Sequence, residues 1–291
     1  MRKNGLGVLL LCAMLSSCVL KQGQDEHKIQ IDVKEIKATY GDKLEISPLD
    51  ESVNISKRQI VLSPVSEGVC YTISGYFNGQ IVNTTKNTEI RLKNAFIENN
   101  SEKPAISSDV KFEVSAAKGT KNYIVSQGRG YSRTAALRSK RSLVIGGGGD
   151  LFVRGKICHG VEAEDMKLKG TGNFYFQGTR KGSAVKCDTL SVEEGKTFNA
   201  YFMNSKNGIK ADRTVNIASG NFFLYNNSVG IKTDISSEGG AKSSKSSKPT
   251  KARAIILSGG TFHTEGLKRF YVTDDGAFQN NGATIIEEGE E

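Results

Sequence analysis

The segment SAVKCDTLSV, residues 183–192, decides the fold. Its apolar residues fall at every second position, Val185 and Cys187 and then Leu190 and Val192, which is the pattern of β-strands and not of helices. The position of Val185 recurs along the chain at steps of 24, 24, 24 and 22 residues. This column consists of Leu137, Val161, Val185, Ile209 and Ile231.

Two further columns keep nearly the same step. The first holds small side chains and consists of Ser139, Ala163, Cys187, Ala211 and Thr233. The second is apolar or aromatic, has steps of 23, 24 and 24 residues, and consists of Leu151, Phe174, Phe198 and Phe222. A fixed period of short strands is typical of a solenoid whose turns stack on one another. Three strand-like segments per turn of about 22–25 residues predict an all-β, three-sided parallel β-helix with these columns inside.

The composition restricts the partners. The 291 residues carry a formal net charge of +9, contain 32 Gly and only 4 Pro, and have no Trp. The many glycines suit tight turns between strands. The basic balance indicates an anionic partner or surface.

The first residues predict export. Arg2 and Lys3 precede an apolar run from Leu6 to Leu15, followed by Ser16, Ser17 and Cys18. This order is typical of a secretory signal peptide, and residues 15–18 resemble the bacterial lipobox, in which the cysteine is acylated. We therefore expect a lipoprotein signal peptide over 1–17, lipidation of Cys18, and a lipid anchor in the cell membrane or outer membrane, with the protein at the cell surface or in the periplasm. The alternative is an ordinary signal peptide with an incidental cysteine.

The rest of the chain divides by composition. We expect a polar tether over 18–28, an N-terminal β segment or cap over 29–64, the β-helix over 65–285 with a Ser- and Lys-rich loop at 236–253, and an acidic tail over 286–291. Beyond the signal region and Cys18, three cysteines remain, Cys70, Cys158 and Cys187, and an odd number does not indicate a disulfide framework. We expect Cys187 to be buried, because it lies in the small inward column.

Several segments together resemble a known family. They are 71–75 (YTISG), 119–122 (GTKN), 135–137 leading into 143–149, 159–161 (HGV) and 207–212 (NGIKAD). In order and spacing, over roughly residues 65–270, they resemble a bacterial carbohydrate-binding family of extracellular right-handed parallel β-helix proteins, typified by a clostridial protein that binds polygalacturonate and carries calcium. The resemblance implies a right-handed β-helix, a polysaccharide partner and possible calcium. The family's Asp-Gly-Ile turn reads Ser183, Asn207 or Val229 at its first position here, which removes carboxylates, the natural calcium ligands.

Two charged columns are expected to point outward, since side chains alternate along a strand. One consists of Arg138, Glu162, Lys186, Lys210 and Lys232, and the other of Lys140, Glu164, Asp188, Asp212 and Asp234. One interpretation is that the two columns neutralise each other as exposed ion pairs. The other is that Lys186, Lys210 and Lys232 bind an acidic polysaccharide, or that Asp188, Asp212 and Asp234 bind calcium.

A second group of candidates follows the third strand of each turn. It is basic and consists of Arg154, Lys156, Arg180, Lys181 and Lys206. Lys156 and Arg180 are 24 residues apart and are expected to be neighbours that bind ligand. Tyr175 and Tyr201 are expected to face outward and to stack on sugar rings, or else to be incidental surface residues.

These patterns favour a membrane-anchored surface protein that binds polysaccharide without catalysis, because extended repeats suit extended polymers. Two alternatives stay open: an adhesin or envelope scaffold that binds protein, and a polysaccharide lyase or hydrolase. No catalytic residue is assigned, since no pair of carboxylates has the arrangement that glycoside hydrolysis requires. The glycines at 146–149 are not followed by the Lys-Ser/Thr of a phosphate loop, so we expect a tight turn there. We expect a monomer and no nucleic-acid partner.

Overall fold

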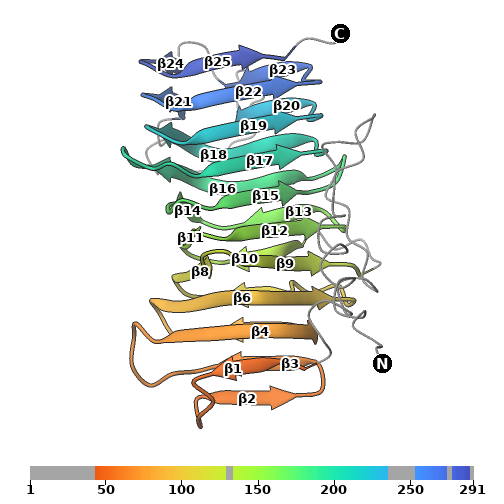
Figure 1. Ribbon diagram of the computed structural model, residues 1–291. Coiled ribbons are helices and arrows are strands. Elements are labelled where there is room, and N and C mark those ends of the chain that lie inside the picture. Colours follow the sequence, from red (N-terminus) through yellow and green to blue (C-terminus); the bar gives the residue numbers. More distant parts are fainter. Residues whose placement is uncertain (1–42, 129–133, 235–252, 274–276, 289–291) are drawn as a thin grey trace, which may run out of the picture.

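The computed structural model describes residues 43–128, 134–234, 253–273 and 277–288. These residues form 25 strands and no helix, and the strands stack in one direction from β2 to β25 (Figure 1). Nearly all neighbouring strands are parallel, and their pairings group into three series, called ladders A, B and C below. The protein is therefore all-β and mostly parallel, as the sequence predicts.

Ladder A contains the column of Val185. In order along the stack it consists of β3 (Gln59–Leu62), β5 (Gln80–Asn83), β7 (Ile106–Ser108), β10 (Ala135–Ser139), β13 (His159–Glu162), the first parts of β16 (Ser183–Val192) and β18 (Asn207–Ile217), β20 (Val229–Thr233) and β23 (Arg269–Val272).

Ladder B follows ladder A along the chain. It consists of the first parts of β4 (Cys70–Asn78) and β6 (Thr88–Asn99), β8 (Phe112–Ala116), β11 (Leu143–Gly147), β14 (Asp165–Leu168), the second parts of β16 and β18, β21 (Ala254–Leu257) and β24 (Phe278–Asn280).

Ladder C completes each repeat. It consists of the second parts of β4 and β6, β9 (Lys121–Ser126), β12 (Asp150–Gly155), β15 (Asn173–Gln177), β17 (Asn199–Met203), β19 (Asn221–Tyr225), β22 (Thr261–Glu265) and β25 (Thr284–Glu287).

The N-terminal end of the stack has the two antiparallel pairings of the described residues. β2 (Val53–Ser56) forms a hairpin with β3, and β1 (Glu45–Ser47) pairs with the beginning of β4. β3 itself is already paired in parallel with β5, so the regular stacking begins at Gln59. The segment expected over 29–64 therefore contributes its last strand to ladder A.

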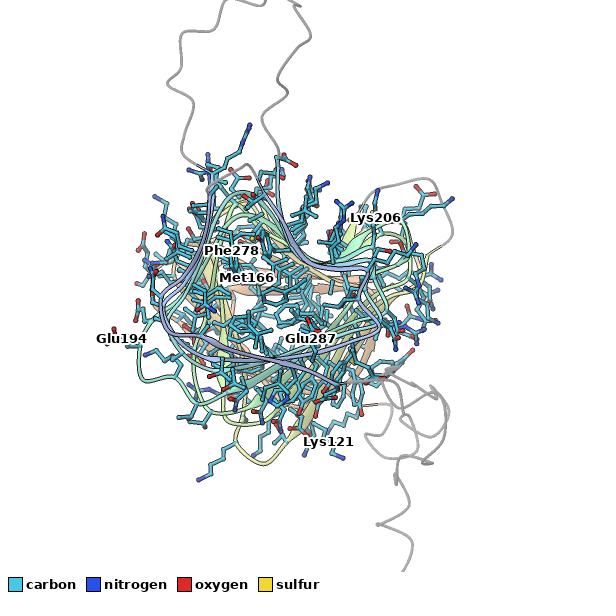
Figure 2. All side chains as sticks on the ribbon, turned by 90° about the horizontal axis from the view of Figure 1, so that it is seen from above. Lys121, Met166, Glu194, Lys206, Phe278 and Glu287 are labelled. Atoms are coloured by element: carbon cyan, nitrogen blue, oxygen red, sulfur yellow. The ribbon has the colours of Figure 1, made fainter. Side chains whose placement is uncertain are left out.

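One continuous apolar core runs through the stack. It extends from Ile60 to Phe262 and is filled by Ile, Leu, Val and Phe side chains from all three ladders. Seen along the stack, these side chains fill the inside of the section around Met166 (Figure 2). Burial at about 25 cal/mol per Å² of apolar surface makes this core the main stabilising contribution.

The register tests the predicted columns. The first column is confirmed, because each of its residues pairs with the next along ladder A and all are fully buried. They are Leu137, Val161, Val185, Ile209 and Ile231. Cys187 pairs with Ala211 and is 2% exposed, which confirms its predicted burial. The third column was wrong at one position, because Phe174 pairs with Ala200 and Ala200 pairs with Phe222.

Phe198 lies just before β17 and not in that column. It is nevertheless fully buried, and its ring contacts Phe174 and Phe222 at centroid distances of 5.6 and 5.8 Å. The step from Phe174 to Ala200 is 26 residues, two longer than the predicted period. The longer connection between β16 and β17 therefore shifts the register, while Phe198 fills the core from the end of that connection.

Glycine permits the sharp corner between ladders B and C. Gly147 and Gly170 have φ angles of +103° and +99°, in the left-handed region. A Cβ atom on Gly170 would lie 2.3 Å from the carbonyl oxygen of Gly147, the glycine of the preceding turn. The glycines at 146–149 thus form a tight turn between β11 and β12, as predicted.

Other predictions concern residues outside the described ranges. They are the signal peptide, Cys18, the tether, the first part of the segment 29–64, nearly all of the loop at 236–253 and the end of the acidic tail.

Candidate ligand-binding surface

Six rings form a continuous stack on the outer side of ladder C, here called the aromatic column. Strand register places one ring per turn at the same position, and the column consists of Tyr123, Phe152, Tyr175, Tyr201, Phe223 and His263. Neighbouring ring centroids are 4.3–4.7 Å apart, and the ring planes differ by only 5–12°. The spacing follows from the distance of about 4.7–4.9 Å between paired strands.

This stacking determines what the rings can offer to a ligand. Because each ring lies against the next, most of its face is covered by its neighbours, and its edge points away from the core. Tyr175 and Tyr201, the two predicted ligand residues, lie in the middle of the column and are only partly exposed. Burial is the main cause that raises the pKa of both phenols, and Asp150 contributes in the same direction. A sugar would therefore meet ring edges and phenol hydroxyls, not open ring faces.

A second outward column lies beside the rings, two residues earlier on each strand; it is called the amide column. Asn173 Nδ2 donates to Asp150 Oδ1 at 2.8 Å, Asn199 Nδ2 donates to Asn173 Oδ1 at 2.9 Å, and Asn221 Nδ2 donates to Asn199 Oδ1 at 2.9 Å. Each amide has remaining hydrogen-bonding capacity, since it carries two donors and two acceptor lone pairs. The column is thus a polar surface with a fixed repeat.

Two cations lie on the other side of the aromatic column. Arg154 lies two residues after Phe152 on β12 and so shares its outward side, and Lys156 follows one residue beyond the end of β12. Lys156 Nζ donates to Gln127 Oε1 at 2.8 Å, and Gln127 Nε2 donates to Glu98 Oε2 at 2.5 Å. Glu98 is 3% exposed and also accepts a hydrogen bond from the Tyr76 hydroxyl. This chain of bonds fixes the ammonium group through a buried carboxylate.

The surroundings of these cations lower their proton affinity. Burial lowers the pKa of Arg154. Burial and the neighbouring Arg154 also lower the pKa of Lys156, against the opposing effect of Glu98. Two neighbouring cations that have lost part of their hydration favour the binding of an anion such as a carboxylate.

The predicted neighbours Lys156 and Arg180 have partners in opposite directions along the stack. Lys156 bonds to Gln127, one turn toward the N-terminal end, whereas Arg180 Nη1 donates to the carbonyl oxygen of Asn226 at 2.7 Å, toward the C-terminal end. Register explains the difference, because Arg154 pairs with Gln177 and Arg180 lies beyond the end of β15. The structure therefore groups Lys156 with Arg154.

The predicted lysine column exists on the outer side of ladder A, where Lys186 pairs in register with Lys210 and Lys210 with Lys232. Two of these ammonium groups are engaged within the chain. Lys186 Nζ lies 3.1 Å from Glu162 Oε1, and Lys210 Nζ lies 3.2 Å from Asp212 Oδ1 and 3.1 Å from Asp234 Oδ1. Although burial acts against it, the carboxylates raise the pKa of Lys210. The pairs of Lys210 join the two columns, as the neutralising interpretation expects, whereas the Lys186–Glu162 pair lies within one column.

The aspartates proposed as calcium ligands have cationic partners. Asp212 and Asp234 share Lys210, and Arg213 Nη2 lies 3.4 Å from Asp188 Oδ2 and 3.5 Å from Asp165 Oδ1. Burial, with contributions from neighbouring acids, raises the pKa of Asp188 against the lowering effect of Arg213. Within the described ranges, no three acidic, His or Cys side chains are grouped so that they could hold a metal ion.

Most of this surface was missed by the sequence analysis. The missed residues are Asp150, Asn173, Asn199 and Asn221 of the amide column and Tyr123, Phe152, Phe223 and His263 of the aromatic column. The sequence contains a signal for these two columns. The asparagines at 173, 199 and 221 and the aromatic residues at 175, 201 and 223 follow each other at the same steps of 26 and 22 residues. This signal was hidden by the assumption of a constant 24-residue step.

Comparison with known proteins gives two matches. A family model described as "carbohydrate-binding domain-containing protein" matches residues 59–166. This stretch is little more than a third of the chain and runs from β3 into β14, including β9 and β12 of the proposed surface.

The second match is a solved structure. The polysaccharide lyase-like protein from C. thermocellum, as a gadolinium derivative, is similar with a TM-score of 0.58 and 16% sequence identity, over 82% of this chain and 96% of that chain. The two proteins therefore share a fold. Among the curated proteins, none matches the chain. The described residues contain no helix long and apolar enough to cross a membrane.

Proposed function

We propose that the protein binds polysaccharide without catalysis, and that the ligand lies along the outer side of ladder C. The observation that carries the proposal is the juxtaposition of the aromatic and amide columns. The aromatic column presents one ring edge per turn, with hydroxyls on its tyrosines, and the amide column presents amides on three successive turns. A repeating ligand meets a ring edge at each turn, so weak contacts add up along one chain. The carbohydrate-binding family model over residues 59–166 supports the same class of ligand.

We further infer that ladders A, B and C are the three sides of a right-handed parallel β-helix. The chain passes through the ladders in the same order in every repeat, and successive strands of each ladder are parallel. Connections between parallel strands of one sheet are right-handed in nearly all cases. Such a solenoid presents an extended flat side, which suits an extended polymer.

An acidic glycan is the ligand class that we propose. Arg154 and Lys156 lie next to the aromatic column, where the carboxylates of a bound chain could reach them, and the whole chain is basic. The lysines of ladder A contribute less, because Lys186 and Lys210 are already paired with carboxylates. Direct pairing with cations requires no bridging calcium.

A glycan array with the purified full chain tests this function, in parallel with a depolymerisation assay on pectin and glycosaminoglycans. We expect binding to acidic polysaccharides that weakens as salt rises, because exposed charges are screened over about 10 Å at 0.1 M. We expect binding to persist in EDTA and no shortening of the polymer. Release of unsaturated sugars would identify a lyase, and binding to protein partners but to no glycan would favour an adhesin or scaffold.

We also propose that the protein is exported and held on a membrane through acylated Cys18, as residues 15–18 indicate. Two or more acyl chains on one residue give stable anchoring. In a bacterial host, Cys18→Ala is expected to abolish incorporation of a clickable palmitate and to move the protein out of the membrane fraction. Unchanged labelling would contradict the anchor.

A further inference from the structure

A hollow of about 650 Å³ lies at the N-terminal end of the stack, away from the middle of the aromatic column. It is bounded by the beginning of the described chain, by β4 and β6, and by the first residues of β9. Lys43, Lys93 and Lys121 contribute to its wall, together with one carboxylate, Glu45. The wall therefore carries three positive charges and one negative charge.

Backbone geometry creates this hollow. Gly75, at a register shift between β4 and β6, has a φ angle of +81°, and a Cβ atom on it would lie 1.9 Å from the carbonyl oxygen of Lys43. The absence of a side chain at Gly75 lets the chain leading into β1 lie close against β4. Asn94, with a φ angle of +51°, accepts a hydrogen bond at Oδ1 from the backbone N–H of Lys121 at 3.3 Å. Lys43, Lys93 and Lys121 are thus brought together from three separate segments.

The lysines of the hollow differ from those of ladder A in their ion pairs. In the part of the chain that the structure describes, neither Lys93 nor Lys121 forms an ion pair with a carboxylate, and Lys43 lies 3.6 Å from Glu45 in a pair that is largely exposed. Lys186 and Lys210, in contrast, have close carboxylate partners. A concave wall with a net charge of one sign concentrates the field in front of it.

We propose that this hollow is a binding site for a phosphate or sulfate group. Three ammonium groups in one wall favour a phosphate or sulfate group, because its several acceptor oxygens can each meet one of these compact point charges. The Ser74 hydroxyl, also in the wall, is a further donor. The site is separate from Arg154 and Lys156, so it goes beyond the proposed binding of an acidic glycan along ladder C.

Calorimetric titration of the full chain with inorganic phosphate, and separately with inorganic sulfate, tests the site at low salt. We expect one saturable site per chain. The double variant Lys93→Gln/Lys121→Gln is expected to lose about tenfold in affinity, since two charge contacts of about 0.7 kcal/mol each are removed. The matched control Lys181→Gln/Lys206→Gln removes the same charge elsewhere and is expected to change affinity less than twofold. Figure 2 shows Lys206 at the upper right and Lys121 at the lower right of the section.

A gain-of-affinity variant makes the test sharper. Glu45→Gln removes the one carboxylate of the wall and is expected to tighten binding of both anions by a few-fold. Loss or no change in this variant, absence of saturable binding, or an equal loss in the two double variants would overturn the proposal.

The anion could be carried by a glycan or by a lipid headgroup, and two further arms distinguish these sources. The first compares a sulfated glycosaminoglycan with its unsulfated counterpart, and the second compares phosphatidylcholine vesicles with and without phosphatidic acid. The source of the anion is identified by the comparison in which two results coincide. Binding must depend on the sulfate or phosphate, and the affinity must fall in Lys93→Gln/Lys121→Gln. Because Lys121 pairs with Asp150 of the amide column, the single variant Lys93→Gln is used for this comparison, and its binding to a carboxylate-only glycan is expected to be unchanged. Failure of the hollow is thereby separated from failure of the proposed function.

Discussion

The outer sides of ladders A and C both carry stacked side chains, but they differ in how much of their chemistry is used inside the molecule. On ladder A, Lys210 lies within 3.2 Å of two carboxylates, and Lys186 is paired with Glu162. On ladder C, Arg154 and Lys156 lie together beside rings and amides that form hydrogen bonds along the stack. A ligand would have to displace ion pairs with carboxylates on ladder A, whereas on ladder C the ammonium group of Lys156 is bonded to a neutral amide. A column of like charges is therefore not by itself a binding site.

The largest expected effect compares the apolar core with the outer side of ladder C. Phe198→Asp places a charge in the core and is expected to destabilise the protein by about 3–5 kcal/mol, because the buried charge has no partner. Tyr201→Asp, on the outer side of the same ladder, is the matched control and is expected to cost clearly less. Thermal melting followed by circular dichroism measures both. Equal melting temperatures of Phe198→Asp and the wild type would contradict the position of Phe198 in the core.

A smaller effect is expected when the ring stack is kept and its hydroxyls are removed. Tyr175→Phe/Tyr201→Phe preserves the ring contacts at 4.5 Å but deletes two hydrogen-bonding groups. We expect acidic-glycan affinity to fall about tenfold, at about 0.5–1.5 kcal/mol for each lost bond. The melting temperature should change little. If the affinity stays at the wild-type value, the phenol hydroxyls do not contact the ligand.

The smallest effect is a shift in pH dependence. The pKa of Lys156 is lowered from its ordinary value of 10.5, so its positive charge is lost at a lower pH than that of an ordinary lysine. Binding of an acidic glycan requires the charged form of Lys156. As the pH rises, the affinity is therefore expected to begin to decline before the pH reaches 10.5. In Lys156→Arg the decline should move to higher pH. Identical pH profiles of the two proteins would show that Lys156 does not contact the anion.

The sequence predicted the inner columns of ladder A well, for a physical reason. Buried positions must alternate and must recur once per turn, so Leu137, Val161 and Val185 could be aligned without coordinates. The alignment failed at Phe198, because the connection before β17 is longer and hydrophobicity alone does not distinguish it from Ala200. Both residues are buried.

The candidate surface was harder to predict, because it depends on side-chain contacts across turns. Tyr175 and Tyr201 were expected to face outward, but the covering of their faces by neighbouring rings follows only from the exact register. The two ion pairs of Lys210, with Asp212 and with Asp234, depend on side-chain conformation, which a sequence pattern does not give. The hollow near Lys121 depends on the close approach of the Lys43 backbone to Gly75, which no repeat pattern indicates.

The central claim is that ladder C, and not the lysine column of ladder A, binds the acidic glycan. The most direct measurement compares the affinity of the full chain for polygalacturonate in two charge-removing variants. Arg154→Gln/Lys156→Gln is expected to lose about a hundredfold, because charge-assisted hydrogen bonds contribute about 1.5–3 kcal/mol each. Lys186→Gln/Lys210→Gln/Lys232→Gln removes more charge but is expected to lose less than about threefold, since Lys186 and Lys210 are engaged within the chain. The reverse order, with the triple variant losing binding and the double variant retaining it, would contradict the account.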